Sequence, residues 1–522
     1  MVKFRLLILG LFSLGLAGRP PAWADEIAPT RIGRISAIEG TASIRPSGGE
    51  WSGAGVNDPV GSGMAVRAGD KARAQLRIGP DAIALAAGTR VEIGRLDPGA
   101  TQIALPQGRI GIHLGRLDQP NTVEIDLPHG GIWLEAPGDY DIYAGDEKNP
   151  ASIATLDGSA RVIVENLDRT VTAGSVLALN GGNTPRAKLD AGAREEAGIW
   201  WLPDGGDAAK PQALQFVSAE LTGYDALDGN GSWQNVEGLG EVWYPNPLPD
   251  DWAPYRYGHW RWLQPWGWTW IDGMPWGFAT SHYGRWARID ERWAWVPGPH
   301  SEQPVYAPAL VAFLGTAGVG ISYPDGNGPA VAWFPLAPGE AYWPSYTNDP
   351  DTIRRINAGS GADLSAMAAA GNGAAPTAIV NGEYQNRRSA SVVPRPVFTA
   401  GRAVAPALID LPERRLDNAP LLAGSPQIPP AATPVQVASA AHTLARILEP
   451  RAAPNPTRTV AVLRGGRHSG SAPIKTVAAS SHSRARPPHV ARERIIAVST
   501  THTARSRPVH LAAASHHHLK LR

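Results

Sequence analysis

The sequence predicts a mainly β protein: an N-terminal antiparallel β-sandwich-like domain, a short helical connector, a Trp-rich β-hairpin module and a disordered C-terminal tail. Three observations predict this fold class. Gly and Pro make up about a fifth of the 522 residues, which favours turns over long helices. Short runs of alternating apolar and polar residues recur through the first third of the chain. Ten of the 19 tryptophans fall between Trp252 and Trp295, several of them at alternate positions as on one face of a strand.

Residues 1–24 have the features of a secretory signal peptide. Lys3 and Arg5 precede the apolar run LLILGLFSLGLAG, and AWA before Asp25 suits a small-residue cleavage site. An uncleaved membrane anchor is the alternative, but this run is shorter than the roughly 20 apolar residues that a membrane span needs. We therefore expect a periplasmic or otherwise exported protein.

The chain contains no cysteine, which excludes disulfides, thiolate metal ligands and cysteine nucleophiles.

Residues 31–190 are predicted to form the β-sandwich-like domain. Runs such as TASIRP, TRVEIGRL and NTVEIDLP are separated by clusters of Gly, Pro, Asn and Asp, which favours antiparallel strands over βαβ units. In one of these runs Val123, Ile125 and Leu127 alternate with polar residues, as in a strand with one buried face.

This segment resembles the FecR-type periplasmic domain. The resemblance rests on GRISAIEGTASIRP, on VNDPVGSGMAVRAGDKARAQLRIGPDAIALAAGTRVEI, and on the later LDGSARVIV and VTAGSVLAL. It implies a location in the bacterial envelope. In that family the domain passes signals from an outer-membrane receptor to a sigma factor, so a regulatory sensor without its own membrane anchor is one alternative for this chain.

Residues 191–222 are the predicted helical connector, because DAGAREEAGIWW and PQALQFVSAELTGY contain good helix formers. Residues 224–300 are the predicted Trp-rich module. YGHWRW at Tyr257 recurs as YGRWAR at Tyr283, and PWGWTW at Pro265 recurs as PWGFAT at Pro275, with turns expected at IDGM and PWG. The pattern indicates a small twisted sheet of hairpins. A less regular β extension is expected over residues 301–400.

The Trp-rich stretch resembles the Trp-rich region of exported bacterial envelope proteins of unknown function. The matching residues are EVWYPNPLPDDWAPYRYGHWRW, PWGWTWIDGMPWGFATSHYGRW and RWAWVPG, followed by VAWFPLAPGEAYWPSY at 331–346. The resemblance implies an envelope protein and carries no known activity.

The tryptophans can serve as core or as a binding surface. Some must form the core, because only Leu263, Ile271, Met274 and Ile289 supply other large aliphatic side chains between residues 252 and 295. The remainder are predicted to stack on the sugar rings of an envelope polysaccharide or peptidoglycan, or to anchor a partner protein. The predicted ligand-binding residues are Trp260, Trp262, Trp266, Trp268, Trp270, Trp276, Tyr283, Trp286, Trp293, Trp295, Arg261 and Arg285.

No catalytic residue, cofactor or metal site is predicted. A carbohydrate-active enzyme is the alternative, because glycoside hydrolysis needs only two suitably spaced carboxylates. Acidic residues in or near the module are Asp250, Asp251, Asp272, Asp290 and Glu291. Such residues are also typical of β-turns, and the chain lacks nucleophile-elbow, P-loop and dinucleotide motifs. His259 and His282 have no third metal ligand at a defined spacing.

Residues 401–522 are rich in Ala, Pro, Arg and His without periodicity, which predicts a disordered basic tail. From Arg451 to Arg522 there are thirteen Lys or Arg residues and one acid, Glu493. This charge suits an anionic surface as partner, and export argues against nucleic acid. No transmembrane span is expected after the signal segment. The sequence thus predicts an exported, non-catalytic protein that binds or scaffolds in the cell envelope.

Overall fold

The structure is a computed structural model that describes residues 29–117, 119, 122–164, 167–180, 186–191, 211–300, 303–315, 321–322, 329–365, 383–422 and 424–431. The expected signal segment at 1–24, most of the expected connector and the expected tail beyond residue 431 lie outside these residues. The described chain is mainly β, as predicted.

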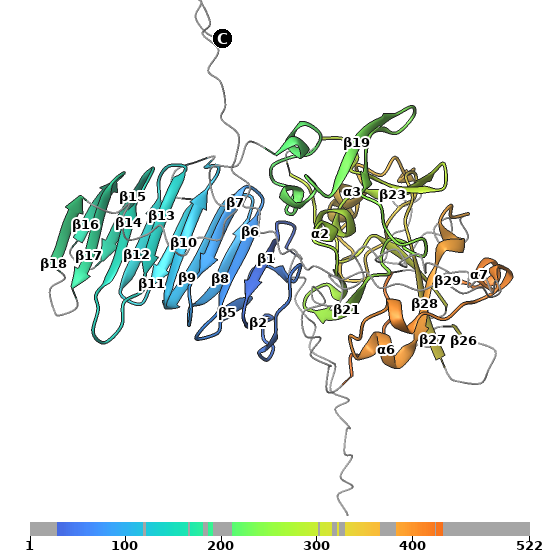
Figure 1. Ribbon diagram of the computed structural model, residues 1–522, viewed down its shortest axis with the longest axis horizontal. Helices are drawn as coiled ribbons and strands as arrows, with labels where there is room; N and C mark the ends of the chain where they lie inside the picture. The colour runs from blue at the N-terminus through green and yellow to red at the C-terminus, as the bar shows by residue number, and fades with distance from the viewer. Residues whose placement is uncertain are drawn as a thin grey trace, which may run out of the picture. The chain divides into compact units, whose positions relative to one another are not determined.

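Residues 33–191 form a sandwich of two nine-stranded sheets (Figure 1). Sheet A has the strand order β18 (Arg186–Ala191), β17 (Ser175–Asn180), β14 (Ala151–Thr155), β13 (Gly138–Tyr143), β10 (Arg109–Leu114), β7 (Asp81–Leu85), β6 (Arg73–Ile78), β1 (Gly33–Glu39), β4 (Pro59–Val60). Sheet B has the order β16 (Leu167–Thr172), β15 (Ser159–Val164), β12 (Gly130–Leu134), β11 (Val123–Leu127), β9 (Ala100–Gln107), β8 (Arg90–Asp97), β5 (Ala65–Ala68), β2 (Ala42–Arg45), β3 (Ser52–Gly53).

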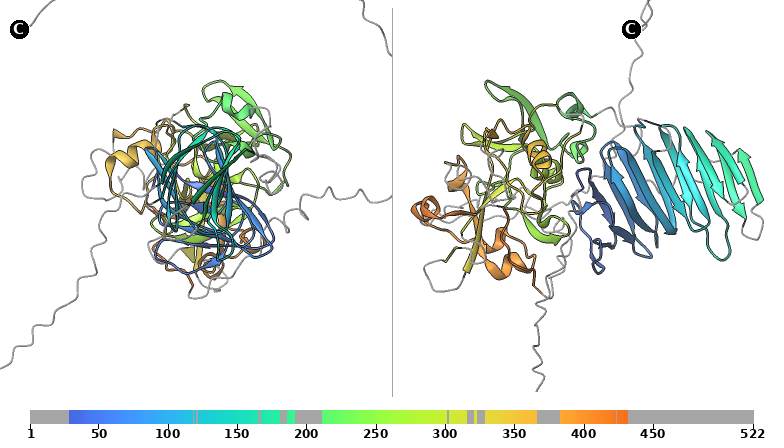
Figure 2. Two further views of the ribbon diagram at one scale, coloured as in Figure 1. Left: turned by 90° about the vertical axis from the view of Figure 1, so that its left-hand side faces the viewer. Right: turned by 180° about the vertical axis from the view of Figure 1, so that it is seen from behind.

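From β6 onward the chain alternates between the two sheets, mostly in hairpins. The pairs β6–β7, β13–β14 and β17–β18 belong to sheet A, and β8–β9, β11–β12 and β15–β16 belong to sheet B. The right view of Figure 2 shows the strands of the sandwich side by side. Neighbouring strands are antiparallel except β9 and β11, which run parallel. The predicted antiparallel sandwich is confirmed.

Side-chain alternation explains the core of the sandwich. In β11, Val123 and Ile125 are buried whereas Glu124 and Asp126 lie on the outer face. Ile132 of the neighbouring strand is fully buried in the same way. Aliphatic side chains from the inner faces of both sheets therefore merge into one continuous core.

Three further sheets and several short helices follow between residues 211 and 431. The four-stranded sheet C has the order β19 (Gly231–Val236), β20 (Gly240–Pro245), β24 (Arg292–Val296), β23 (Arg285–Ile289), and hairpin D pairs β21 (Gly258–Leu263) with β22 (Gly267–Asp272). Sheet E comprises β26 (Ile321–Ser322), β27 (Pro329–Pro335), β25 (Val311–Leu314), β29 (Leu421–Leu422) and β28 (Ser391–Pro394), which pairs with β27. The helices are η1 (Gln212–Gln215), η2 (Tyr224–Ala226), α2 (Gly277–His282), α3 (Pro350–Asn357), η3 (Arg387–Ser389), α6 (Arg395–Thr399), η4 (Ala405–Ala407) and α7 (Glu413–Asn418).

The structure differs from the sequence prediction at two places in this region. The segment after IDGM forms helix α2 between two hairpins, where the sequence predicts only turns. The predicted start of the disordered tail at residue 401 is also too early. Residues 401–431 contain η4, α7 and β29, and they bury Val404, Leu416 and Ile428. Val404 and Ile428 join the main core and Leu416 joins a smaller cluster with Phe334. These few apolar residues have no local periodicity, so the composition of the segment does not reveal them.

Specific hydrogen bonds join the sandwich to the region that follows it. The Thr222 hydroxyl donates to the Ile32 carbonyl at 2.6 Å. The side-chain amide of Asn57 donates to the carbonyls of Asp272 and Met274 at 3.0 and 2.8 Å. These atoms are buried, so the contacts fix residues on both sides. In the described part of the chain, no helix has the length and apolar character needed to cross a membrane.

Candidate binding site

The predicted binding tryptophans are mostly core residues. Eight of the ten between Trp252 and Trp295 are at most 7% exposed. Trp260 lies at their centre, with ring centroids of Trp270, Phe313, Trp333 and Phe398 5.2–5.5 Å away. Indoles replace the aliphatic side chains that this segment lacks. The prediction that these side chains bind a ligand is therefore wrong for eight residues, because they are buried. They are Trp260, Trp266, Trp268, Trp270, Trp276, Trp286, Trp295 and Tyr283.

Several of these indoles also hold the backbone of neighbouring segments. The Nε1–H of Trp268 donates to the Ile428 carbonyl at 2.9 Å, and that of Trp295 donates to the Tyr283 carbonyl at 2.9 Å. Trp286 donates to the Thr280 carbonyl at 3.0 Å. Each bond satisfies a polar group inside the core and ties a loop or helix to a strand.

The other two predicted tryptophans, Trp262 and Trp293, are half-buried. Trp262 packs edge-on against Trp268 at 5.5 Å, on hairpin D. Trp293 packs against Trp286 at 6.4 Å, on sheet C. Because they stand on separate sheets, they form no continuous row of exposed indoles.

The two predicted arginines have structural partners. The half-buried Arg261 pairs with Asp58 of the sandwich at 2.7 Å. Arg285 is 3% exposed and donates to the carbonyls of Glu340 and Gly284 at 3.1 and 2.8 Å and to Asn357 Oδ1 at 2.9 Å. Burial lowers the pKa of the Arg285 guanidinium to about 10. Both side chains are occupied in holding the fold.

Three of the carboxylates considered for catalysis, Asp272, Asp290 and Glu291, have structural roles. Asp272 is 6% exposed and accepts hydrogen bonds from Trp270 Nε1, Ser281 Oγ and the Met274 amide at 2.8, 3.2 and 2.8 Å. Burial raises its pKa to about 6. Asp290 and Glu291 form the two-residue turn between β23 and β24, with φ of 47° and 61° as in a type I′ turn. None of these three lines the cavities described below.

The histidines weighed as metal ligands do not gather with other ligands. His282 is fully buried, its Nδ1 lies 2.7 Å from the Ala307 carbonyl, and burial lowers its pKa to about 3. Within the described ranges, no three His, Cys, Asp or Glu side chains lie close enough to hold a metal ion.

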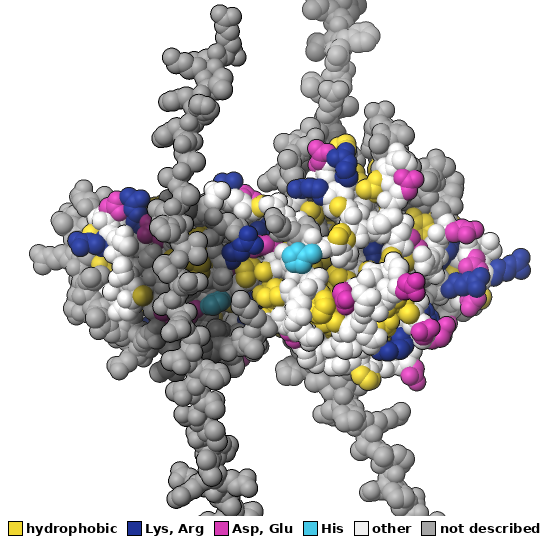
Figure 3. All heavy atoms as spheres, turned by 90° about the horizontal axis from the view of Figure 1, so that it is seen from above, with side chains coloured by type: hydrophobic (Ala, Val, Ile, Leu, Met, Phe, Trp, Pro, Cys, Tyr) yellow, Lys and Arg dark blue, Asp and Glu magenta, His cyan; other side chains and the backbone are white. Residues whose placement is uncertain are grey.

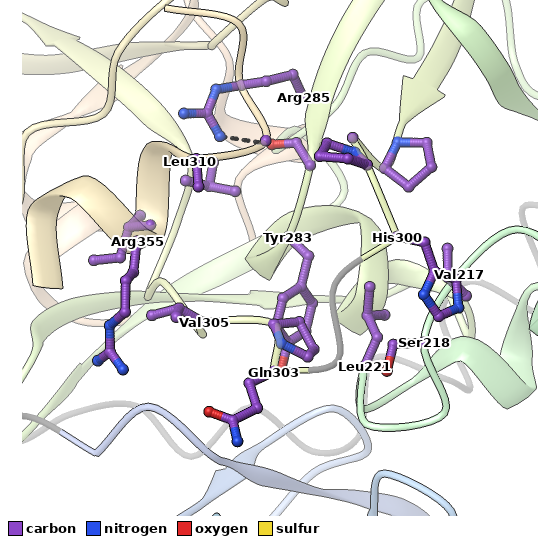
Figure 4. A pocket seen from close by; sticks show the side chains of 18 of the residues that line it. Val217, Ser218, Leu221, Tyr283, Arg285, His300, Gln303, Val305, Leu310 and Arg355 are labelled. Carbon is purple, nitrogen blue, oxygen red and sulfur yellow. Dashed lines mark hydrogen bonds between the residues drawn. The ribbon is translucent and has the colours of Figure 1, made fainter. Parts of the chain in front are cut away.

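A cavity of about 110 Å³ lies beside Tyr283 (Figure 4). Its walls come from the segment after η1, the start of β23, residues 297–300 and 303–305, and the end of α3. Figure 4 shows the Tyr283 ring between Arg355 on one side and His300 with Val217 on the other. The cavity thus has apolar walls and polar groups at its edges, as binding pockets commonly do.

A second cavity of about 140 Å³ adjoins the first and shares Gln303, Pro304, Val305 and Arg355 with it. It is lined on the sandwich side by Arg31 and Arg116. We call the two cavities together the junction groove. Among the described residues its only lining carboxylate is Glu220, which lies 3.2 Å from Arg31.

Helix α3 positions Arg355 by ordinary helix signals. Asp349 caps the helix by accepting from the Thr352 amide at 2.8 Å, and Pro350 occupies the first turn. Arg354 and Arg355 follow in the last turn, where positive charge is favourable. Arg355 is exposed and makes no ion pair with the residues that the structure describes. The sequence NDPDTIRRIN carries these helix signals, but nothing in it indicates that Arg355 faces a groove.

Comparison with known families is informative for this same region. Residues 224–340 match a family of unknown function, DUF6600. The match runs from η2 to Glu340 and includes Tyr283, His300 and Gln303 of the junction groove. It agrees with the predicted resemblance of the Trp-rich region to proteins of unknown function, whereas the FecR resemblance stays a prediction.

Among solved structures, two crystal structures of a candidate anti-sigma factor from Parabacteroides distasonis, at 2.50 and 1.65 Å resolution, are similar to part of the chain. Each has 11% sequence identity and a TM-score of 0.22, and the likeness covers 24% of this chain and 59% of that one. This chain thus spans about three fifths of the length of those structures. No curated protein matches the sequence.

The burial of the tryptophans predicts the fluorescence of the protein. Emission of the folded chain is expected to be blue-shifted and weakly quenched by acrylamide, because most described indoles are inside. A minor accessible fraction should come from half-buried residues such as Trp262 and Trp293. Stern–Volmer quenching in buffer and in urea measures both fractions. Quenching of most of the emission in the native protein would contradict the structure.

Proposed function

We propose that the protein is a non-catalytic component of the cell envelope that binds an envelope polysaccharide or a partner protein at the junction groove. Export rests on the signal-like residues 1–24, which lie outside the described part of the chain. The basic tail would add salt-sensitive attraction to an anionic surface. The binding role rests on the groove.

The observation that carries the proposal is the lining of the groove. Arg31, Arg116, Arg355, His300 and Gln303 line the groove beside apolar walls such as Val305. The Arg31 guanidinium already pairs with Glu220 and Asp81, whereas Arg355 has no ion pair among the described residues and offers its N–H groups to a ligand. Glycoside hydrolysis by the usual route needs two carboxyl groups on either side of the bond. The described lining of the groove presents one, Glu220, and that one is paired with Arg31. This lining favours binding of acceptor groups over hydrolysis.

The size of the groove favours a ligand that enters only in part. Its cavities measure about 110 and 140 Å³, whereas sites for whole drug-sized ligands take about 300–1,000 Å³. A substituent of a polymer or a side chain of a partner protein would fit. On the face shown in Figure 3, positively and negatively charged side chains are interspersed with apolar ones. Because no electrostatic field of a single sign covers this face, selectivity for a ligand has to come from a local groove.

A charge reversal in the groove tests the proposal. Arg355→Glu is expected to lower the affinity for peptidoglycan sacculi or envelope polysaccharide at least tenfold, because it replaces a donor with a repelling acceptor. Arg354→Glu is the matched control, since Arg354 is on the same helix and pairs with Asp351 without lining the groove. Affinities can be measured by co-sedimentation and by titration calorimetry.

Two results would count against the proposal. Equal affinity of the two variants would exclude the groove as the binding site. Release of soluble sugar from the polymer by the wild-type protein would instead indicate an enzyme.

A further inference from the structure

A half-buried indole surrounded by arginines lies on the sandwich, away from the Trp-rich module. Trp51 directly precedes β3, the edge strand of sheet B. The guanidinium carbons of Arg45, Arg67 and Arg90 are 5.2, 5.3 and 5.8 Å from its ring centroid. These distances are within the range of cation–π attraction. We call these four residues the Trp51 cluster.

The strand register brings the three arginines to one face. Arg45, Arg67 and Arg90 stand on β2, β5 and β8, which are consecutive neighbours in sheet B. Arg67 pairs directly with Arg90, and Ser43 pairs with Arg67 on the other side. The adjoining residues of these strands, such as Val66 and Val91, are fully buried in the sandwich core. Because side chains alternate along a strand, the arginines lie on the outer face.

The charges of the cluster are not balanced by the described part of the protein. Glu92 is the only carboxylate there that pairs with it, 3.5 Å from Arg45 and in contact with Arg90. Arg67 is exposed and has no ion pair among the described residues. Like charges directly opposite each other destabilise a sheet. The core lies on the other face, so packing does not require arginine at position 67.

We propose that the Trp51 cluster binds an acidic sugar unit of an anionic polysaccharide. Arginine forks pair with carboxylate or phosphate oxygens through parallel hydrogen bonds, and an anion between Arg67 and Arg90 would relieve their repulsion. The indole offers a flat apolar surface to the C–H face of the sugar ring. The site is separate from the junction groove, and it rests on the proposed function only for the expectation that the protein meets envelope polymers.

The test uses the protein chain with residues 25–522 and three defined polymers. Polygalacturonate carries carboxylates, phosphomannan carries phosphates, and dextran is neutral. Wild-type protein is expected to bind at least one of the two anionic polymers at low salt, to bind it more weakly at high salt, and not to bind dextran. Arg67→Glu is expected to reduce the affinity at least tenfold, and Trp51→Ala to reduce it several-fold. Titration calorimetry gives the affinities, and circular dichroism verifies the fold.

Two variants on the same sheet serve as controls. Trp133 on β12 is also half-buried, and its strand partners are Glu124 and Arg161. Unlike Arg67, Arg161 has an ion pair, with Asp168 at 2.6 Å. Arg169→Glu on edge strand β16 makes the same charge change as Arg67→Glu at a distant exposed position. Trp133→Ala and Arg169→Glu are expected to bind within twofold of wild type.

The outcomes separate this inference from the proposed function. A loss with Arg67→Glu but not with Arg355→Glu supports the Trp51 cluster alone, and the polymer that binds identifies carboxylate or phosphate. Wild-type affinity in both Arg67→Glu and Trp51→Ala would overturn the inference, as would equal binding of dextran or no binding of either anionic polymer.

Discussion

Replacing Trp260 by alanine is expected to lower the free energy of unfolding of the Trp-rich region by roughly 3–5 kcal/mol. Trp260 is 1% exposed and contacts four other aromatic rings from β22, β25, β27 and α6. Its removal leaves a cavity that these large, rigid rings cannot readily fill. The lost burial of apolar surface and the cavity therefore both lower the free energy of unfolding. Urea denaturation followed by far-UV circular dichroism measures the change without relying on tryptophan emission.

Trp293→Ala is the matched control for this prediction. Trp293 belongs to the same region but is half-buried on strand β24, with Arg288 6.0 Å from its ring. Its removal exposes less new apolar surface and is expected to cost no more than about 2 kcal/mol. If both variants unfold at the same urea concentration, Trp260 is not the centre of the core.

The sandwich could be predicted from the sequence because its signals are local. Alternation in runs such as Val123 to Leu127 marks one buried face, and Gly- and Pro-rich turns mark the strand ends. The pairing of strands in two sheets depends on contacts far apart in the sequence. The parallel pair β9 and β11, for example, leaves no local trace.

The binding residues were harder to predict for a physical reason. Tryptophans at alternate positions can line either face of a strand, and only the tertiary fold decides which face is covered. In β22, Trp268 and Trp270 are covered by α6 and by β27, which come much later in the chain. Trp51 directly precedes β3 whereas Arg67 lies on β5, and Arg355 is far from Arg31 in the sequence, so neither proposed site has a local pattern.

The carboxyl group of Asp272 is expected to make stability depend on pH. Its folded-state pKa of about 6 lies above the ordinary value of 3.8, because the group is buried without a cation beside it. A carboxyl with a raised pKa stabilises the fold fully below pH 3.8, and this contribution is lost as the pH rises through about 6. The difference of about two pKa units corresponds to about 3 kcal/mol.

Comparison of Asp272→Asn with wild type isolates this contribution, since other groups titrate alike in both proteins. Between about pH 3 and pH 7 the wild type should lose about 3 kcal/mol more stability than Asp272→Asn. The buried His282, with its pKa lowered to about 3, acts in the opposite sense in both proteins and cancels in the difference. Urea denaturation at a series of pH values measures both profiles.

The variant Trp270→Phe separates titration of Asp272 from its hydrogen bonding, because it removes the 2.8 Å bond from Trp270 Nε1 but keeps the carboxyl group. That bond favours the charged form, so without it the folded-state pKa should rise further and the pH dependence of stability should steepen.

If the stability profiles of wild type and Asp272→Asn run parallel with pH, the carboxyl of Asp272 titrates as it does in the unfolded chain. Water would then reach this carboxyl in the native protein.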